Sequence, residues 1–156
     1  MQEKAIFAAG CFWGVEDAFR KVPGVIEAVS GYTGGHVEHP TYEQVCTDTT
    51  GHAEAVEVTF DPSEVSYETL LRKFFELHDP TQMNRQGPDV GSQYRGAVFY
   101  LSDAQKGATE KLKAELQSQF LPKTIATEIT AASTFWPAEE YHQHYFEKHP
   151  NAVCHI

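Results

Sequence analysis

The feature that most constrains this chain is a short apolar run that ends in a glycine and a cysteine. Residues 4–9 read KAIFAA, and the motif GCFWG follows at residues 10–14, where a helical pattern begins. A short run that is apolar on both faces is typical of a strand in the middle of a sheet. A buried strand that leads directly into a helix predicts a layered fold, with helices packed on a sheet.

The helix expected over residues 11–22 has two different faces. Its apolar stripe consists of Phe12, Val15, Phe19 and Val22. At about 100° per residue, Trp13 lies far from that stripe, on the side of Asp17 and Arg20. A binding pocket would explain an indole ring on the polar face of a helix.

Cys11 stands where this helix begins, and a thiol there can be a nucleophile. Unpaired N–H groups and the positive end of the helix dipole favour the thiolate. Two other readings stay open at this point. Free cysteines are often simply buried in the core. The sequence AAGC at residues 8–11 resembles a lipoprotein attachment signal, but the preceding apolar segment is too short for one.

The remaining elements alternate between strands and helices along the chain. Strands are expected at residues 25–30, 54–60, 96–101 and 125–130. Helices are expected over 42–46, after Ser66, and after Ser102, the last with Ala104, Ala108, Leu112 and Leu116 facing inward. Residues 31–41 and 81–94 read as loops, and residues 135–156 as an irregular, aromatic and histidine-rich tail with a helical turn near 139–146.

These elements predict an α/β (α+β) fold, a two-layer sandwich with a ferredoxin-like core and additional helices. A chain of 156 residues is expected to form one domain over 1–156. A hydrophobic content of 41% and no window as long as a membrane span favour a soluble protein. The net charge of −10 argues against a nucleic-acid partner.

Three cysteines, Cys11, Cys46 and Cys154, are an odd number without the spacing of a zinc motif. With no signal peptide apparent, we expect a reducing, cytoplasmic location. A disulfide there is more often transient and catalytic than structural. Cys154 lies in the terminal tail, so it is free to approach Cys11. We expect Cys46 to be a buried structural thiol.

Glu54 shares the side of its strand with Val56, Val58 and Phe60. A carboxyl group on that apolar side loses its hydration, so its pKa should rise and it could serve as a general acid near neutral pH. The alternative is a glutamate at a strand end that simply reaches water. The residues alone do not decide between these two readings.

Several motifs together resemble a known family. They are GCFWG at 10–14, Gly34-Gly35 with Pro40-Thr41-Tyr42, GHAE at 51–54, GPDVG at 87–91 with QYR at 93–95, and Tyr141-His142-Gln143. In this order, over nearly the whole chain, they are similar to the A-type peptide methionine sulfoxide reductases. The resemblance implies a reductase that returns the S epimer of methionine sulfoxide, free or in proteins, to methionine, and so repairs oxidised proteins.

The resemblance also implies a role for each site residue. Cys11 would be the nucleophile, Phe12 and Trp13 the pocket for the substrate methyl group, Glu54 the proton donor, Tyr42 and Tyr94 hydrogen-bond donors to the sulfoxide oxygen, and Asp89 an organiser of the site. In the family, a resolving cysteine near the C-terminus, here Cys154, forms a disulfide that thioredoxin reduces. We expect a monomer that uses no metal and no cofactor and that binds neither a membrane nor nucleic acid.

Simpler readings compete with these roles. Asp89 could cap a turn after Pro88, and Tyr42 and Tyr94 could be ordinary core residues. The eight histidines lack a metal-binding spacing, so we expect them to be solvated or structurally bonded. Two rival functions are a Cys–His hydrolase and a module that binds methionine without turnover. The sequence places no histidine near Cys11, which disfavours the hydrolase.

Overall fold

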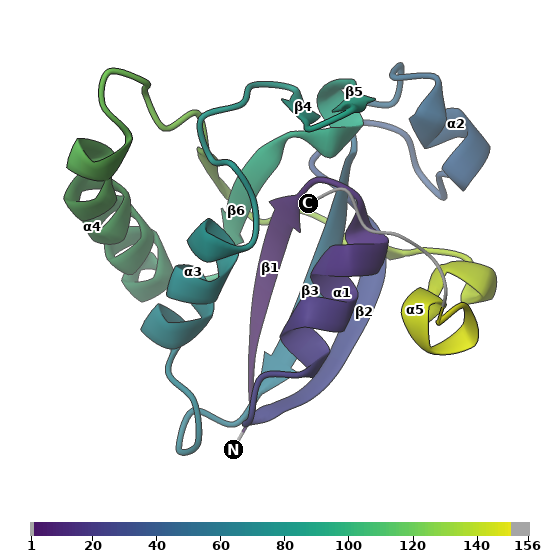
Figure 1. The fold of residues 1–156 in the computed structure, drawn as a ribbon. Coiled ribbons are helices and arrows are strands. Elements are labelled where there is room, and N and C mark those ends of the chain that lie inside the picture. Colours follow the sequence, from purple (N-terminus) through teal and green to yellow (C-terminus); the bar gives the residue numbers. More distant parts are fainter. Residues whose placement is uncertain (1, 151–156) are drawn as a thin grey trace.

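The computed structural model describes residues 2–150. It consists of a six-stranded sheet, with helices packed on one face (Figure 1). The strands of this sheet are β1 (Glu3–Ala9), β2 (Val25–Thr33), β3 (Ala53–Phe60), β6 (Gly96–Tyr100), β7 (Glu128–Ala131) and β8 (Trp136–Pro137). The helices are α1 (Phe12–Arg20), α2 (Tyr42–Cys46), α3 (Tyr67–Glu76), α4 (Asp103–Phe120) and α5 (Tyr145–Lys148). A two-stranded hairpin, β4 (Arg85–Gln86) and β5 (Asp89–Val90), lies apart from the sheet.

The order of the strands is β7-β6-β1-β3-β2-β8. β3 is antiparallel to both β1 and β2, so β1 and β2 run in the same direction with β3 between them. β6 is antiparallel to β1 on its other side. This arrangement is the split βαβ of a ferredoxin-like sheet, extended at its edges by β7 and β8. The predicted fold class is therefore confirmed, and β1 is central as expected.

One face of the sheet carries the main core. Phe7 of β1 stacks on Phe19 of α1 at 5.0 Å and on Phe74 of α3 at 5.4 Å between ring centroids. Phe12, Val15 and Phe19 are buried, as their helical spacing predicts. The stacked rings hold α1 and α3 side by side on the sheet, which places the N-terminal end of α1 at the upper edge in Figure 1.

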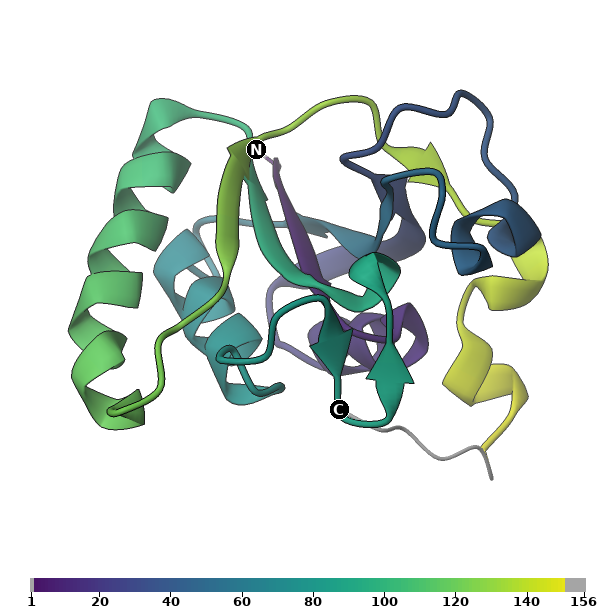
Figure 2. The ribbon, with the colours of Figure 1, turned by 90° about the horizontal axis from the view of Figure 1, so that it is seen from above.

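The opposite face of the sheet carries a smaller core, which an irregular segment of the chain covers instead of a helix. Ile6, Ala8, Ala55 and Phe99 form a small buried cluster there, against Ala132 and Phe135. Figure 2 shows the segment after β7 crossing this side of the sheet toward β8. Within residues 2–150, no helix combines the length and apolar character needed to cross a bilayer.

Two predicted strand boundaries shift by three residues, and the buried face of one helix differs from the prediction. β2 extends through Thr33, because residues 31–33 pair with β3. β7 begins at Glu128, three residues later than expected, and pairs in parallel with β6. In α4, Ala104 is exposed and Thr109 is buried instead. This helix packs on α3 and on β6 and β7 near one end of the sheet, so only a narrow stripe of it is covered.

Candidate active site

Cys11 is the N-cap residue of α1, directly beyond the end of β1. Gly10, with a φ of 96°, turns the chain between the two elements, a conformation that favours glycine. The Cys11 side chain makes no capping hydrogen bond and is half-buried. Its sulfur therefore stands at the end of a helix where backbone N–H groups face outward, as its place in the sequence predicted.

Glu54 lies beside this helix start and is only 1% exposed. Its Oε1 accepts a hydrogen bond of 3.3 Å from the Phe12 N–H, and its Oε2 has no hydrogen-bond partner among the described residues. Burial raises the pKa of Glu54 to about 8, with a further increase from Asp89, although the Phe12 N–H opposes it. The reading in which Glu54 reaches water is wrong, and at neutral pH the carboxyl group keeps its proton.

Tyr94, Tyr42 and Asp89 surround this carboxyl group. Burial and then the charge of Glu54 raise the pKa of both tyrosine hydroxyls well above the usual range. Asp89 and Cys11 also act on Tyr94. Tyr94 belongs to a 3-10 turn at Ser92–Tyr94, and Asp89 to β5. Hydroxyls with such high pKa values remain hydrogen-bond donors throughout the neutral range.

An aromatic group forms the other side of the site. Phe12 is 1% exposed and packs against Tyr42, with ring centroids 6.3 Å apart. Trp13 is half-buried, away from the apolar stripe of α1, as predicted. Its indole stacks on Tyr145 at 3.7 Å and 5° between ring planes.

His142 is a site residue that the sequence patterns did not predict as such. It is 1% exposed, and its ring packs on Phe12 at 5.1 Å and on Tyr42 at 4.3 Å. Its Nδ1 accepts a hydrogen bond of 2.9 Å from Trp13 Nε1, so the ring proton is on Nε2. Burial lowers the pKa of His142. The only signal in the sequence was the motif Tyr141-His142-Gln143.

The sequence alone placed no histidine near Cys11, and the structure brings His142 to the next two residues of the helix, but the hydrolase reading gains nothing. A general base needs a free nitrogen lone pair. The lone pair of neutral His142 is engaged by Trp13. Its Nε2 has no hydrogen-bond partner in the part of the chain that the structure describes, so no carboxylate orients it.

Glu139 is a second residue that the sequence did not reveal. Its carboxylate accepts the Tyr32 hydroxyl at 2.8 Å and the backbone N–H of Tyr42 at 3.0 Å. Burial opposes its ionisation, but hydrogen bonds from Tyr42 and Tyr32 lower its pKa overall. Glu139 thereby ties the start of α2 to the tail and holds the Tyr42 ring over Phe12.

Two cysteine predictions have different outcomes. Cys46, expected to be a buried structural thiol, is exposed. It is the last residue of the one-turn helix α2, which packs through Val45 and turns Cys46 outward. Partial burial of its sulfur raises its pKa, although a hydrogen bond with Tyr42 opposes the rise. Cys154 lies outside the described residues.

His52, two residues before Glu54 in the sequence, is structurally bonded, as expected. His52 Nδ1 accepts the Gly35 N–H at 3.0 Å, and its Nε2 lies 2.7 Å from the Val37 carbonyl oxygen. Among residues 2–150, no group of three or more His, Cys, Asp or Glu side chains is arranged to hold a metal ion.

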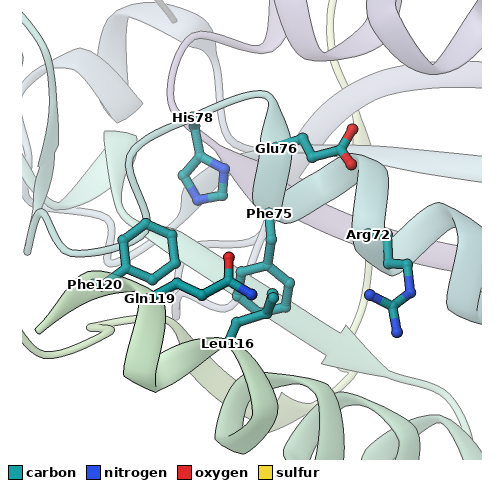
Figure 3. A pocket seen from close by; sticks show the side chains of 7 residues that line it. All are labelled: Arg72, Phe75, Glu76, His78, Leu116, Gln119 and Phe120. Carbon is teal, nitrogen blue, oxygen red and sulfur yellow. The ribbon is translucent and has the colours of Figure 1, made fainter.

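A hollow of about 420 Å³ lies elsewhere, between α3 and α4 (Figure 3). Its lining residues are Arg72, Phe75, Glu76, His78, Leu116, Gln119 and Phe120. None of the predicted site residues lines it, and it offers no thiol. This hollow is therefore separate from the site that the sequence predicted.

Known proteins provide an independent comparison. A sequence model described as peptide methionine sulfoxide reductase matches residues 3–156. The chain is 58% identical over 153 residues to "Peptide methionine sulfoxide reductase MsrA" of Geobacter sulfurreducens, covering 97% of this chain and 94% of that protein. A protein of the same name from Methanothermobacter thermautotrophicus is 58% identical over 155 residues, 99% of this chain and 92% of that protein.

Solved structures agree with the sequence matches. The reduced form of Mxr1 from Saccharomyces cerevisiae has a TM-score of 0.93 and 36% identity, covering 99% of this chain and 89% of that chain. Methionine sulfoxide reductase A of Corynebacterium diphtheriae has a TM-score of 0.88 and 36% identity, covering 98% and 77%. Mxr1 in complex with Trx2 has a TM-score of 0.67 and 29% identity, covering 92% and 84%.

Proposed function

This chain belongs to the peptide methionine sulfoxide reductase family and is an oxidoreductase that reduces methionine sulfoxide, and from that premise we propose how its own residues carry the reaction. The substrate is the S epimer of methionine sulfoxide, free or within an oxidised protein. Cys11 is the nucleophile, Glu54 the proton donor, and Phe12 with Trp13 the wall against which the methyl group rests. The protein acts as a single-domain, cytoplasmic monomer.

In the first step, the Cys11 thiolate attacks the sulfoxide sulfur while Glu54 transfers its proton to the sulfoxide oxygen. The attack forms a bond between the two sulfurs. As the protonated oxygen passes to Cys11, this bond and the sulfur–oxygen bond of the substrate both break, so the products are methionine and a sulfenic acid on Cys11. Tyr42 and Tyr94 donate hydrogen bonds to the oxygen as negative charge develops on it. The electrostatic effect of Asp89 raises the pKa of Glu54 further, which favours the protonated carboxyl group.

One observation carries this proposal: a carboxyl group held protonated next to the cysteine at the start of α1. Glu54 is 1% exposed, hydrogen-bonded to the Phe12 N–H, and has a pKa raised by burial to about 8. A sulfoxide oxygen leaves sulfur only if it receives a proton, and an acid with a pKa near the working pH transfers one efficiently. Cys11, the proposed nucleophile, directly precedes Phe12, whose N–H donates to the proposed acid Glu54.

The proposed roles require a single reactive epimer. In this scheme, the attacking sulfur, the proton donor and the aromatic wall each contact a different part of the sulfoxide group. A sulfoxide sulfur is a stereocentre, so only one configuration satisfies all three at once. Turnover assays on the separated S and R epimers test this, and equal rates on both would contradict it.

The sulfenic acid is then resolved by a second thiol. Cys154 attacks the Cys11 sulfur, water leaves, and a Cys11–Cys154 disulfide forms, which thioredoxin reduces by thiol–disulfide exchange. The crystallised complex of the yeast relative with Trx2 supports this choice of reductant.

We predict that Cys154→Ser still reduces one equivalent of substrate but no longer cycles with thioredoxin. Without its resolving thiol, the enzyme retains the sulfenic acid and depends on a small reductant such as dithiothreitol. Single-turnover quantification of methionine and a disulfide map of the oxidised protein measure both effects. Cys11→Ser, the control, should produce no methionine at all. Thioredoxin-driven cycling at the wild-type rate in Cys154→Ser, or a Cys11–Cys46 bond, would exclude Cys154 from the scheme.

A further inference from the structure

A buried carboxylate on α1 takes no part in the chemistry described above. Glu16 is 1% exposed, and its Oε1 accepts the Ser30 hydroxyl at 3.1 Å. Both of its oxygens lie 3.0 Å from the backbone N–H of His144. Arg20 Nη1 lies 3.6 Å from Oε2. Burial raises the pKa of Glu16, and the donors Ser30, His144 and Arg20 oppose that rise by favouring the ionised carboxylate. Burying a charge is costly unless it has such partners, so the interaction needs a reason.

The amide that Glu16 holds belongs to a tight turn of the tail. His144 has a φ of 54° and ψ of 40°, a left-handed conformation that is uncommon for a residue with a side chain. The turn lies between the two residues that contact the indole of Trp13. His142 accepts its N–H at 2.9 Å, and Tyr145 stacks on its ring at 3.7 Å.

Trp13 and Glu16 are three residues apart on the helix, so they lie on one face of it. Arg20, one turn further on, continues that face and forms an ion pair of 2.6 Å with Glu147 of α5. Three residues on one face of α1, namely Trp13, Glu16 and Arg20, thus contact the tail in succession. Figure 1 shows α5 beside α1, well away from α3 and α4.

We propose that Glu16 is a positioning residue for the substrate pocket. Its carboxylate fixes the turn at His144, and the turn holds His142 and Tyr145 against Trp13, so that the indole stays in the orientation that receives the methyl group. The inference rests on the proposed role of Trp13. Glu16 itself touches neither the substrate nor Cys11.

The test is the isosteric variant Glu16→Gln, which removes the negative charge and replaces one of the two oxygens that the His144 N–H contacts with an NH₂ group that cannot accept it. We expect KM for a methionine sulfoxide peptide to rise about tenfold while kcat changes less than about twofold, since ground-state binding is what the pocket supplies. Asp17→Asn is the matched control. It is the next residue along the helix and forms only an exposed ion pair with Lys21, so its KM should equal that of the wild type.

A second readout follows Trp13 directly. The chain has two tryptophans, so a Trp136→Phe background leaves Trp13 as the only indole fluorophore. Releasing its N–H and its stacking partner should shift its emission to longer wavelength in Glu16→Gln. Loss of thermal stability alone, with wild-type KM and emission, would show a merely structural role and overturn the inference.

A double-mutant cycle separates this inference from the proposed function. Trp13→Phe should raise KM, and adding Glu16→Gln to it should change KM less than about twofold, because the two act through the same ring. If Trp13→Phe leaves KM unchanged, the proposed role of Trp13 fails. If only Glu16→Gln leaves it unchanged, the inference alone fails.

Should Glu16→Gln not fold, Arg20→Gln tests the same attachment of the tail to α1 at its half-exposed residue. It removes the ion pair to Glu147 and the 3.6 Å ion pair to Glu16, while the hydrogen bonds from Ser30 and His144 to Glu16 stay in place. We expect a rise in KM of about threefold, with a smaller emission shift in the same direction. Wild-type KM in Arg20→Gln would overturn the inference.

Discussion

At the scale of single residues, the acid beside the cysteine helix is kept neutral by its surroundings. Glu54 is buried, accepts one backbone N–H, and has the negative Asp89 as an electrostatic neighbour. Taking a carboxylate out of water is unfavourable and a nearby negative charge adds to the cost, so the proton stays until about pH 8. A group that would destabilise the fold when charged is thereby available as an acid.

We predict that Glu54→Gln lowers kcat by about 10² to 10⁴, the usual contribution of a positioned acid, with little change in KM. Glutamine has the same shape but no proton of comparable acidity to give. Glu57→Gln on the same strand is the control. Glu57 has the opposite parity and pairs with Lys4 at the surface, so its removal should leave turnover unchanged. Steady-state kinetics with dithiothreitol measure both variants, and near-wild-type kcat in Glu54→Gln would rule out the acid role.

At the scale of elements, the connection from β2 to β3 determines where α2 and its tyrosine lie. Gly35 passes so close to the start of β3 that an added Cβ would stand 2.4 Å from both the His52 nitrogen and the Thr50 carbonyl oxygen. His52 then bonds the loop on both ring nitrogens. This close approach of two backbone segments explains the second glycine of the pair, whereas Gly34 has a φ of 89°, which favours glycine.

We predict that Gly35→Ala destabilises the protein by about 1 to 3 kcal/mol, because backbone must move to accept the methyl group, and that it reduces turnover by displacing Tyr42. Gly107→Ala is the matched control. Gly107 lies in α4, where an added Cβ would meet nothing within 4 Å, so alanine should stabilise by about 0.5 to 1 kcal/mol. Urea unfolding measures both, and equal effects of the two substitutions would refute the close-approach argument.

At the scale of the whole molecule, two buried titratable groups limit stability from opposite sides. Glu54 keeps its proton up to about pH 8, whereas the unfolded chain loses it near 4.5, so stability falls as pH rises between these values. Burial lowers the pKa of His78 to about 4, although its bond to the Phe74 carbonyl opposes this. The unfolded chain takes up that proton near 6.5, so stability falls as pH drops from 6.5 to 4.

We predict that each group contributes a slope of up to about 1.4 kcal/mol per pH unit within its window. Urea unfolding at pH 5, 6.5 and 8 measures the profile. Glu54→Gln should be more stable than the wild type at pH 8 and gain little at pH 5. His78→Asn should reduce the loss of stability between pH 6.5 and pH 5. If Glu54→Gln shows the same decline toward pH 8 as the wild type, the carboxyl group is not the one titrating.

Much of the fold could be predicted from local patterns. The apolar run before Cys11, the alternation after Ala53 and the spacing of Leu70, Leu71, Phe74 and Phe75 each identified an element whose bounds the structure reproduces within a few residues. Strand parity also placed Glu54 on the core side. These features repeat with the period of a helix or a strand, so neighbouring residues are enough to reveal them.

Local sequence patterns therefore predict the elements and their order, and the family motifs mark the thiol and the carboxyl group. The packing of distant segments determines that Glu54 is deep enough to hold a proton, that Cys46 faces outward, and that three hydrogen-bonding residues, His142, Glu139 and Glu16, connect the tail to α1, α2 and β2. Those three residues bond to positions 97 to 129 residues away along the chain. Burial and hydrogen bonding between such distant segments arise from packing, which leaves no periodic signal in the sequence.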